Sequence, residues 1–153
     1  MNFPQSIKSR SYTDTESVGI ELARAVLADS KLPRFVALYG DLGVGKTAFT
    51  RGFTSIIAPS ARVKSPTFAL VNQYKGDTIS VFHFDMYRIG SEDELYSIGF
   101  FDYTETNNIC ITEWSENIEY ALPPSFVRVE ISKDDPNDTD SRRIDVQLVT
   151  AAP

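Results

Sequence analysis

The sequence is poor in the residues that build disulfides and zinc sites. It has one cysteine, Cys110, and one histidine, His83, among 153 residues. A single cysteine cannot form an internal disulfide, and with a single histidine it cannot make a Cys/His zinc site. Cys110 lies in the apolar run Ile109-Cys110-Ile111, which indicates a buried, inert thiol. This usage fits a reducing compartment.

Long apolar runs are missing as well. A helix that spans a bilayer needs about 20 consecutive apolar residues, and no segment approaches that length. The first ten residues, MNFPQSIKSR, lack the apolar stretch of a secretory signal. We therefore expect a cytoplasmic protein that makes no contact with a membrane.

Positive charge is in short supply. The 15 Lys and Arg residues are outnumbered by 21 Asp and Glu, which gives a formal net charge of -6. Such a surface repels a phosphate backbone unless a local basic patch compensates, so unaided binding of nucleic acid is disfavoured. A chain of 153 residues, 42% of them hydrophobic, suits one globular domain. We predict a single domain over residues 1–153, with flexible ends at 1–10 and 150–153.

Residues 40–47, GDLGVGKT, match the phosphate-loop spacing G-x-x-x-x-G-K-[ST] at every fixed position. The glycines let the backbone aim N–H groups at phosphate oxygens, and a helix starting near Lys46 adds a positive dipole end. The Lys46 ammonium suits the β and γ phosphates, and the Thr47 hydroxyl suits magnesium. We therefore predict a nucleotide site with Mg²⁺. The loop alone leaves kinases, GTPases, motors and switches open, and ATP or ADP becomes the predicted nucleotide only with the missing motifs considered below. The predicted contacts in this loop are Asp41, Leu42, Gly43, Val44, Gly45, Lys46, Thr47 and Ala48.

The segments around the loop predict an α/β domain. Residues 35–39 form a short apolar run typical of a strand buried on both faces, and residues 46–58 have helical spacing without proline. The capping-box spacing of Thr13-Asp14-Thr15-Glu16 predicts an earlier helix that ends near residue 30. Strand, loop and helix followed by further strands predict a three-layer, P-loop NTPase-like domain with a mixed, mostly parallel central sheet. Downstream we expect a hairpin at 67–74 and 79–87, a short helix from Ser91 to Gly99, a strand at 109–112, a turn or two of helix at 116–122, and strands at 126–132 and 143–149 around the turn-rich segment 133–140.

Two acidic residues follow apolar strands. Asp85 ends the run VFHFD, and Glu113 ends the run ICITE. A carboxylate in such a position is costly to bury without a cation or another partner. We predict that both face the nucleotide, that one binds the metal directly, and that the other holds a metal-bound or attacking water. The residues leave open which acid does which, and the predicted catalytic residues are Lys46, Asp85 and Glu113.

Three further residues have competing interpretations. Thr67 lies in the segment KSPTF, where a switch segment would lie, and its hydroxyl could sense the γ phosphate. The sequence of the segment alone favours the other interpretation, an ordinary polar start of a strand. Trp114 could stack near the nucleotide or fill the core, and the core is favoured. A lone histidine such as His83 is more often packed or hydrogen-bonded than catalytic.

Missing motifs narrow the class of nucleotide protein. There is no Asn-Lys-x-Asp motif for guanine and no transporter-ATPase signature, and the only adjacent arginines, Arg142 and Arg143, do not make an arginine-rich kinase lid. The functions that remain are hydrolysis of ATP and binding of ATP without hydrolysis.

Five blocks occur together in a specific order: GDLGVGKTAFTRGF, KSPTFALVNQY, VFHFDMYRI, EDELYSIGFFDY and ICITEWSENI. In order and spacing they resemble the TsaE (YjeE) family of bacterial tRNA threonylcarbamoyladenosine biosynthesis proteins. The resemblance implies a cytoplasmic Mg²⁺-dependent ATPase that works with TsaD and TsaB to modify the adenosine beside the anticodon of tRNAs reading codons that begin with A. It also implies that TsaD performs the transfer and that tRNA is reached only through the complex. Hypotheses from other classes are a nucleotide-sensing docking module with negligible hydrolysis and a small-molecule kinase.

The resemblance also implies site roles. It places Lys46 and Thr47 at the phosphates and magnesium, and makes Glu113 the metal-associated glutamate and Asp85 the other functional acid. The remaining implied contacts to the nucleotide are Thr67 and Trp114, the regions of Thr13 and Glu116 near the base or ribose, and an arginine at Arg142 or Arg143, of which Arg143 is the predicted contact. The chain departs from the family pattern at Ala48, where a second threonine is more frequent, and in the acidic segment 133–141.

Overall fold

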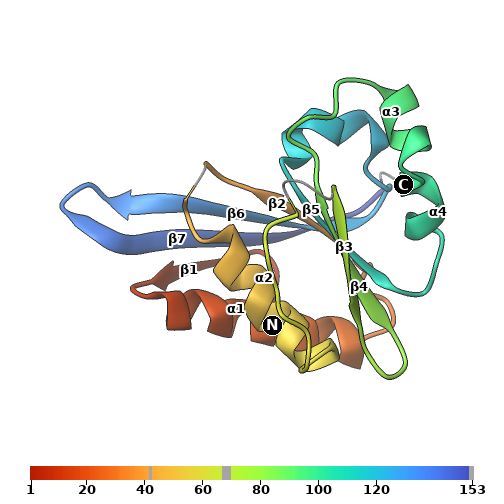
Figure 1. Ribbon diagram of the computed structural model, residues 1–153. Coiled ribbons are helices and arrows are strands. Elements are labelled where there is room, and N and C mark those ends of the chain that lie inside the picture. Colours follow the sequence, from red (N-terminus) through yellow and green to blue (C-terminus); the bar gives the residue numbers. More distant parts are fainter. Residues whose placement is uncertain (42, 67–69, 152–153) are drawn as a thin grey trace.

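The computed structural model describes residues 1–41, 43–66 and 70–151 of the chain. Its strands form one seven-stranded sheet in the order β1-β7-β6-β2-β5-β4-β3, with helices on both faces (Figure 1). The elements in chain order are β1 (Gln5–Ser9), α1 (Tyr12–Ala28), β2 (Phe35–Tyr39), α2 (Lys46–Ile57), β3 (Val71–Lys75), β4 (Ser80–Asp85), α3 (Glu92–Ser97), α4 (Phe100–Thr104), β5 (Ile109–Glu113), the 3-10 helix η1 (Ser115–Ala121), β6 (Phe126–Asp135) and β7 (Asp138–Val149).

The middle of the sheet is parallel and its edges are antiparallel. Strand β2 pairs in parallel with β5 and β6, and β4 pairs in parallel with β5. At the edges, β3 runs antiparallel to β4, β6 to β7, and β7 to β1. The predicted three-layer α/β fold with a mixed sheet is therefore confirmed.

Burial of β2 on both faces explains the two helical layers. Every residue of β2 is buried, as its unbroken apolar sequence predicted. Val36 and Leu38 pack into a core shared with α1 and α2, whereas Phe35, Ala37 and Tyr39 pack into a second core with α3, α4 and η1. Alternation along one strand thus fixes which residues meet which layer.

Helices α1 and α2 pack unusually closely because each presents a glycine. A Cβ atom added to Gly52 of α2 would collide with the backbone carbonyl of Glu16, and one added to Gly19 of α1 would collide with that of Phe49. The obstacle is backbone in both cases, so it cannot rotate away. This contact holds the first turn of α2, and with it the phosphate-loop motif, against the N-terminal part of α1.

The N-terminal segment contributes a strand to the sheet. Within residues 1–10, for which flexibility was predicted, Gln5–Ser9 form β1, which pairs antiparallel with β7. The Ser9 hydroxyl is buried and lies 2.7 Å from the Thr15 hydroxyl, which ties the strand to α1. A mostly polar five-residue strand gives too little hydrophobic pattern to be read from sequence.

Element ends differ in two more places. Helix α1 is capped by Ser11, whose side chain accepts a hydrogen bond from the Asp14 amide, so it begins earlier than the Thr13 capping box predicted. The segment predicted to be a long turn, 133–140, instead continues β6 to Asp135 and starts β7 at Asp138. Cross-strand pairing overrides the turn propensity of its Asp and Asn residues.

Several remaining expectations are confirmed. The hairpin of β3 and β4 forms, and α3 is capped by Ser91, whose hydroxyl accepts from the Glu94 amide. Cys110 is buried, and desolvation raises the pKa of its thiol to about 12. In the part of the chain that the structure describes, no helix combines the length and apolarity that a membrane crossing requires.

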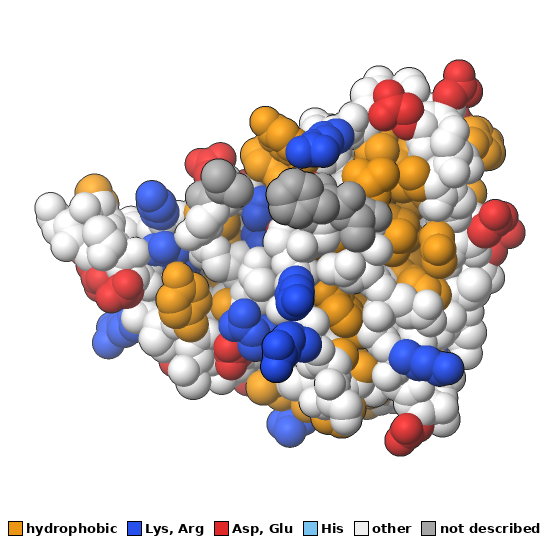
Figure 2. Space-filling view, viewed as in Figure 1, with side chains coloured by type: hydrophobic (Ala, Val, Ile, Leu, Met, Phe, Trp, Pro, Cys, Tyr) orange, Lys and Arg blue, Asp and Glu red, His pale blue; other side chains and the backbone are white. Residues whose placement is uncertain are grey.

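Surface charge is unevenly distributed. Lys and Arg side chains gather near the middle of the face that Figure 2 shows, with acidic side chains mainly toward its rim. Arg62, Lys64 and Lys75 line a hollow of about 510 Å³ that no acidic residue lines among those described. The net charge of -6 therefore does not describe every face of the molecule.

The close approach of α1 and α2 makes Gly52 a sensitive position. Gly52→Ala is expected to lower the free energy of unfolding by about 2 kcal/mol or more, because backbone overlap outweighs the gain of about 1 kcal/mol in helix propensity. Urea unfolding followed by circular dichroism measures the change. The matched control is Glu21→Ala, on the exposed side of α1, which should stay within about 0.5 kcal/mol. Equal or higher stability of Gly52→Ala would contradict the close-packing account.

Candidate functional site

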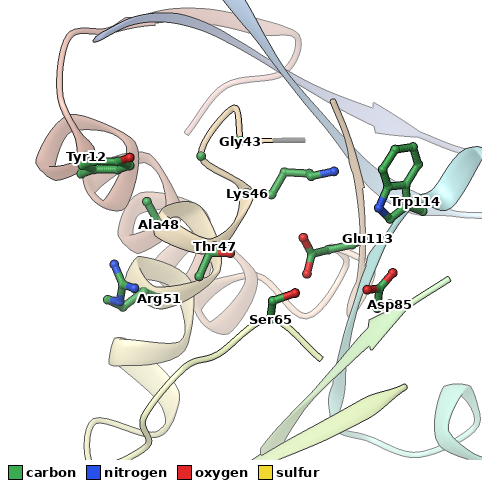
Figure 3. Close-up of a pocket in the computed structure, with 11 residues that line it drawn as sticks. Tyr12, Gly43, Lys46, Thr47, Ala48, Arg51, Ser65, Asp85, Glu113 and Trp114 are labelled. Carbon is green, nitrogen blue, oxygen red and sulfur yellow. The ribbon is translucent and has the colours of Figure 1, made fainter. Parts of the chain in front are cut away.

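A cavity lies at the edge of the sheet where β4 and β5 end and where β2 passes into α2. Its volume is about 520 Å³. Because parallel strands bring their carboxyl ends to one edge, residues far apart in the sequence meet here. The lining residues, drawn in Figure 3, are Tyr12, Gly43, Gly45, Lys46, Thr47, Ala48, Arg51, Ser65, Asp85, Glu113 and Trp114.

Three glycines of the phosphate-loop motif have backbone angles that side chains disfavour. Gly40, Gly43 and Gly45 have φ values of 141°, 79° and 112°. At Gly40, a Cβ atom would also collide with the carbonyl of Ile131 on β6. The loop therefore turns sharply and delivers the N-terminus of α2, at Lys46, to the cavity. The free N–H groups of such a helix start favour an anion.

Lys46 is buried, with 6% of its surface exposed, and no carboxylate partner is found for it among the described residues. Its Nζ donates a hydrogen bond of 2.7 Å to the carbonyl of Gly40 and lies 4.6 Å from the ring centroid of Trp114. Figure 3 shows the side chain extended toward Trp114. The site thus holds a desolvated cation whose present partners are a carbonyl and an aromatic face.

Trp114 sits at the wall of the cavity in a strained backbone conformation. Its φ of 57° is one of two positive values among the described non-glycine residues. Its ring lies 5.0 Å from that of Tyr87 and packs partly against the second core. The two interpretations of Trp114 are therefore not exclusive, because the indole both packs on the core and faces Lys46.

Asp85 and Glu113 lie side by side. They are register partners at the ends of the parallel strands β4 and β5, and they are 7% and 6% exposed. Asp85 Oδ1 accepts a hydrogen bond of 2.9 Å from the Tyr87 amide, and Glu113 Oε2 lies 2.7 Å from His83 Nε2. Both acids line the cavity together with Lys46. That they face a nucleotide, and their roles toward a metal or water, stay predictions.

The other predicted contacts are distributed unevenly. Gly43, Gly45, Thr47 and Ala48 line the cavity, whereas Val44 is buried in the core next to it. The exposed residues Asp41, Thr13 and Glu116 are not among its lining residues. Leu42 and Thr67 lie outside the described residues.

The structure brings Arg142, rather than Arg143, to the phosphate-loop motif. Arg142 Nε donates to the carbonyl of Val44 at 3.0 Å, while Arg143 Nε donates to Ser6 and Asp145. Neighbouring residues of a strand face opposite sides, so only one of the pair can point at the loop. The prediction of Arg143 as a cavity residue therefore has no support in this arrangement.

Sequence reasoning missed Tyr12, Arg51 and Ser65 in the cavity. Arg51 follows Thr47 by one helical turn on α2, so helical spacing could have indicated it. Tyr12 is 73% exposed and reaches the cavity from the first turn of α1, a placement that depends on tertiary packing. Ser65 belongs to the KSPTF block and offered no signal of its own.

Fold and site together define the class: an α/β domain of the P-loop NTPase-like type whose phosphate-loop motif faces two strand-end acids. Within this class, the family model described as threonylcarbamoyl adenosine biosynthesis protein TsaE matches residues 9–144. The chain therefore belongs to the TsaE family.

Similar proteins agree with this assignment. A relative from Haemophilus influenzae, named tRNA threonylcarbamoyladenosine biosynthesis protein TsaE, is 41% identical over 72% of this chain and 68% of its own length. The relative of the same name from Bacillus subtilis is 33% identical over 84% of this chain and 79% of its own. The crystal structure of YdiB from Bacillus subtilis superposes with a TM-score of 0.70 at 25% identity, covering 99% of this chain and 90% of that one.

The adjacent acids give a stability prediction. Asp85→Asn removes one of two neighbouring negative charges and keeps the side-chain oxygen that accepts from the Tyr87 amide. In buffer without divalent cations, the variant is expected to raise the free energy of unfolding by about 1 kcal/mol, because it removes the repulsion between two neighbouring carboxylates. The control is Asp145→Asn, which removes the partly exposed ion pair between Arg143 and Asp145. It should change the free energy of unfolding by less than about 0.5 kcal/mol. A loss of stability in Asp85→Asn would contradict repulsion between the acids.

Proposed function

We propose that the cavity binds ATP with Mg²⁺ and hydrolyses it, and that this activity serves the threonylcarbamoyl modification of the adenosine beside the tRNA anticodon. The observation that carries the proposal is the meeting of the Lys46 ammonium with the Asp85 and Glu113 carboxylates in one cavity behind a phosphate-loop motif. The TsaE family and the names of the relatives support the pathway.

The phosphate end of the nucleotide would lie over the loop and the start of α2. Lys46 Nζ already lies at the cavity wall, held by the Gly40 carbonyl and the Trp114 ring. Phosphate oxygens are stronger partners for an ammonium than a carbonyl or an aromatic face, so a bound nucleotide would draw Lys46 to the β and γ phosphates. The backbone N–H groups of the loop and the first turn of α2 would hold the same phosphates.

The oxygen donors of the cavity fit magnesium. Thr47 offers a hydroxyl, and Asp85 and Glu113 offer carboxylates, which are the hard ligands that Mg²⁺ prefers. Among the described residues, no three His, Cys, Asp or Glu side chains form a metal cage of their own. That agrees with magnesium being held by few protein ligands together with substrate phosphates. When bound, the ion would neutralise charge on the phosphates.

The proposal includes dependence on partners. Arg51 is the arginine among the described lining residues, and it pairs with Glu16 at 3.2 Å. A cation that stabilises charge on the transferred phosphoryl group is often supplied by a second protein. We therefore propose slow hydrolysis by this chain alone, activation by TsaD and TsaB, and access to tRNA through that complex in the cytoplasm.

The ion pair between Arg51 and Glu16 also favours a second candidate function. A nucleotide-sensing module would bind ATP, dock on its partners and hydrolyse little, because no unpaired arginine is found among the described lining residues. Phosphate release stimulated by TsaB and TsaD would exclude this candidate. Docking that requires ATP but releases no phosphate would support it.

The decisive measurement is phosphate release from ATP by the chain alone, with TsaB and TsaD, and with tRNA added. Lys46→Ala and Glu113→Ala are each expected to lower turnover by at least about a hundredfold, because each removes a charge that acts on the phosphates or their metal. Both should also abolish multi-turnover formation of threonylcarbamoyl-tRNA in a reconstituted system.

Matched controls come from exposed residues outside the cavity. Lys31→Ala and Glu105→Ala remove the same charges from the surface and should leave turnover unchanged. Normal multi-turnover formation of threonylcarbamoyl-tRNA with Lys46→Ala or Glu113→Ala would contradict the proposal. Transfer of labelled γ-phosphate to a small-molecule acceptor, in place of release as inorganic phosphate, would indicate a kinase instead.

A further inference from the structure

A buried hydrogen-bonded chain leads away from the cavity into the core. Glu113 Oε2 lies 2.7 Å from His83 Nε2, and His83 Nδ1 lies 3.1 Å from the Tyr74 hydroxyl. The Tyr74 hydroxyl donates to the Lys64 carbonyl at 2.9 Å and accepts from the Lys64 amide at 3.2 Å. We call these four residues the Glu113–Lys64 relay. It joins the carboxyl end of β5 to the segment that precedes Ser65 on the cavity rim.

The setting of His83 calls for an explanation other than stability. Its side chain is fully buried, on the face of β4 that also carries Val81, and its register partner on β5 is Ile111. Val81 and Ile111 both belong to the core beneath α1 and α2. A buried polar pair in such surroundings is seldom more stable than well-packed apolar residues. The imidazole is therefore best explained by what it does to Glu113.

Both ring nitrogens of His83 are hydrogen-bonded. Nδ1 lies 3.1 Å from the Tyr74 hydroxyl, and Nε2 lies 2.7 Å from Glu113 Oε2. The ring is thus fixed from both sides, with one nitrogen directed at Tyr74 and the other at Glu113.

The consequence for Glu113 is geometric. Its side chain extends from the end of β5 into the cavity, with Thr47 on one side and Asp85 on the other (Figure 3). The imidazole takes oxygen Oε2 and leaves Oε1 for a cation or a water. Without that bond the carboxylate could rotate and turn away from the position that its role requires. Hydrogen bonds of this kind to a ligating or catalytic group commonly affect its performance 10–100-fold.

We propose that His83 is a positioning residue for ATP hydrolysis: it holds the Glu113 carboxylate in its working orientation, and Tyr74 holds His83 from behind. The inference rests on the proposed ATPase function. It assigns a role to two core residues, His83 and Tyr74, that are not among the lining residues of the cavity.

Two amide variants separate the halves of the relay. In His83→Gln the side-chain amide nitrogen reaches the position of Nε2 and can still donate to Glu113, whereas in His83→Asn the shorter amide reaches only the position of Nδ1, beside Tyr74. In ATPase assays with TsaB and TsaD, His83→Asn is expected to lower kcat about 10–100-fold with KM for ATP changed less than about twofold. His83→Gln should keep kcat within about threefold of wild type, and Tyr74→Phe should fall between the two.

The outcomes distinguish this inference from the proposed function. If wild type releases no phosphate even with partners, the ATPase proposal fails. If wild type turns over ATP, Lys46→Ala does not, and His83→Asn matches wild type, only the positioning role fails. Equal losses in the Gln and Asn variants would also overturn it, because the bond to Glu113 would then not be what matters. If His83→Asn does not fold, Tyr74→Phe provides the test instead. A kcat in Tyr74→Phe equal to that of wild type would then overturn the role of the relay.

A second readout needs neither nucleotide nor metal. His83 is the only histidine in the sequence, so ¹⁵N-labelled protein gives one pair of imidazole nitrogen signals. Glu113→Ala is expected to shift the Nε2 signal, and Tyr74→Phe the Nδ1 signal. Asp85→Asn, next to Glu113 but outside the relay, is the control and should move neither appreciably. Unchanged signals in Glu113→Ala and Tyr74→Phe would show that the relay does not exist in solution.

Discussion

The parallel pairing of β2, β5 and β4 is the constraint on which the rest of the structure depends. It sets Asp85 opposite Glu113 at one edge of the sheet and places the loop after β2 at that same edge. Parallel strands need cover on both faces, which the two helical layers provide. The cavity, its cation and its two acids all follow from where these strands end.

The helices then decide how closely the loop approaches the acids. Contact between α1 and α2 through Gly19 and Gly52 leaves no room to displace α2, whose first residue is Lys46. The same packing brings Tyr12, at the start of α1, to the cavity. Rigid elements thus hold the charged groups, which is the arrangement that precise chemistry requires.

Polar groups are concentrated where an apolar interior would be more stable. Lys46, Asp85, Glu113 and His83 are buried in or beside cores that are otherwise apolar, and Trp114 adopts a disfavoured backbone angle next to them. Each departs from the pattern that local propensity and burial would select. Departures of this kind gather at functional sites, where the fold stabilises them from outside. The relay of His83 and Tyr74 extends that polar region into the core.

The sequence by itself determined the α/β class, the phosphate-loop motif and the two strand-end acids, because these depend on local spacing and on apolar runs that residues such as 35–39 and 109–112 show directly. Only the tertiary structure decided that Gln5–Ser9 join the sheet, that Arg142 and not Arg143 meets the loop, and that Glu113 is bound to His83. Those outcomes depend on register and on contacts between distant segments. Local pattern carries no information about either.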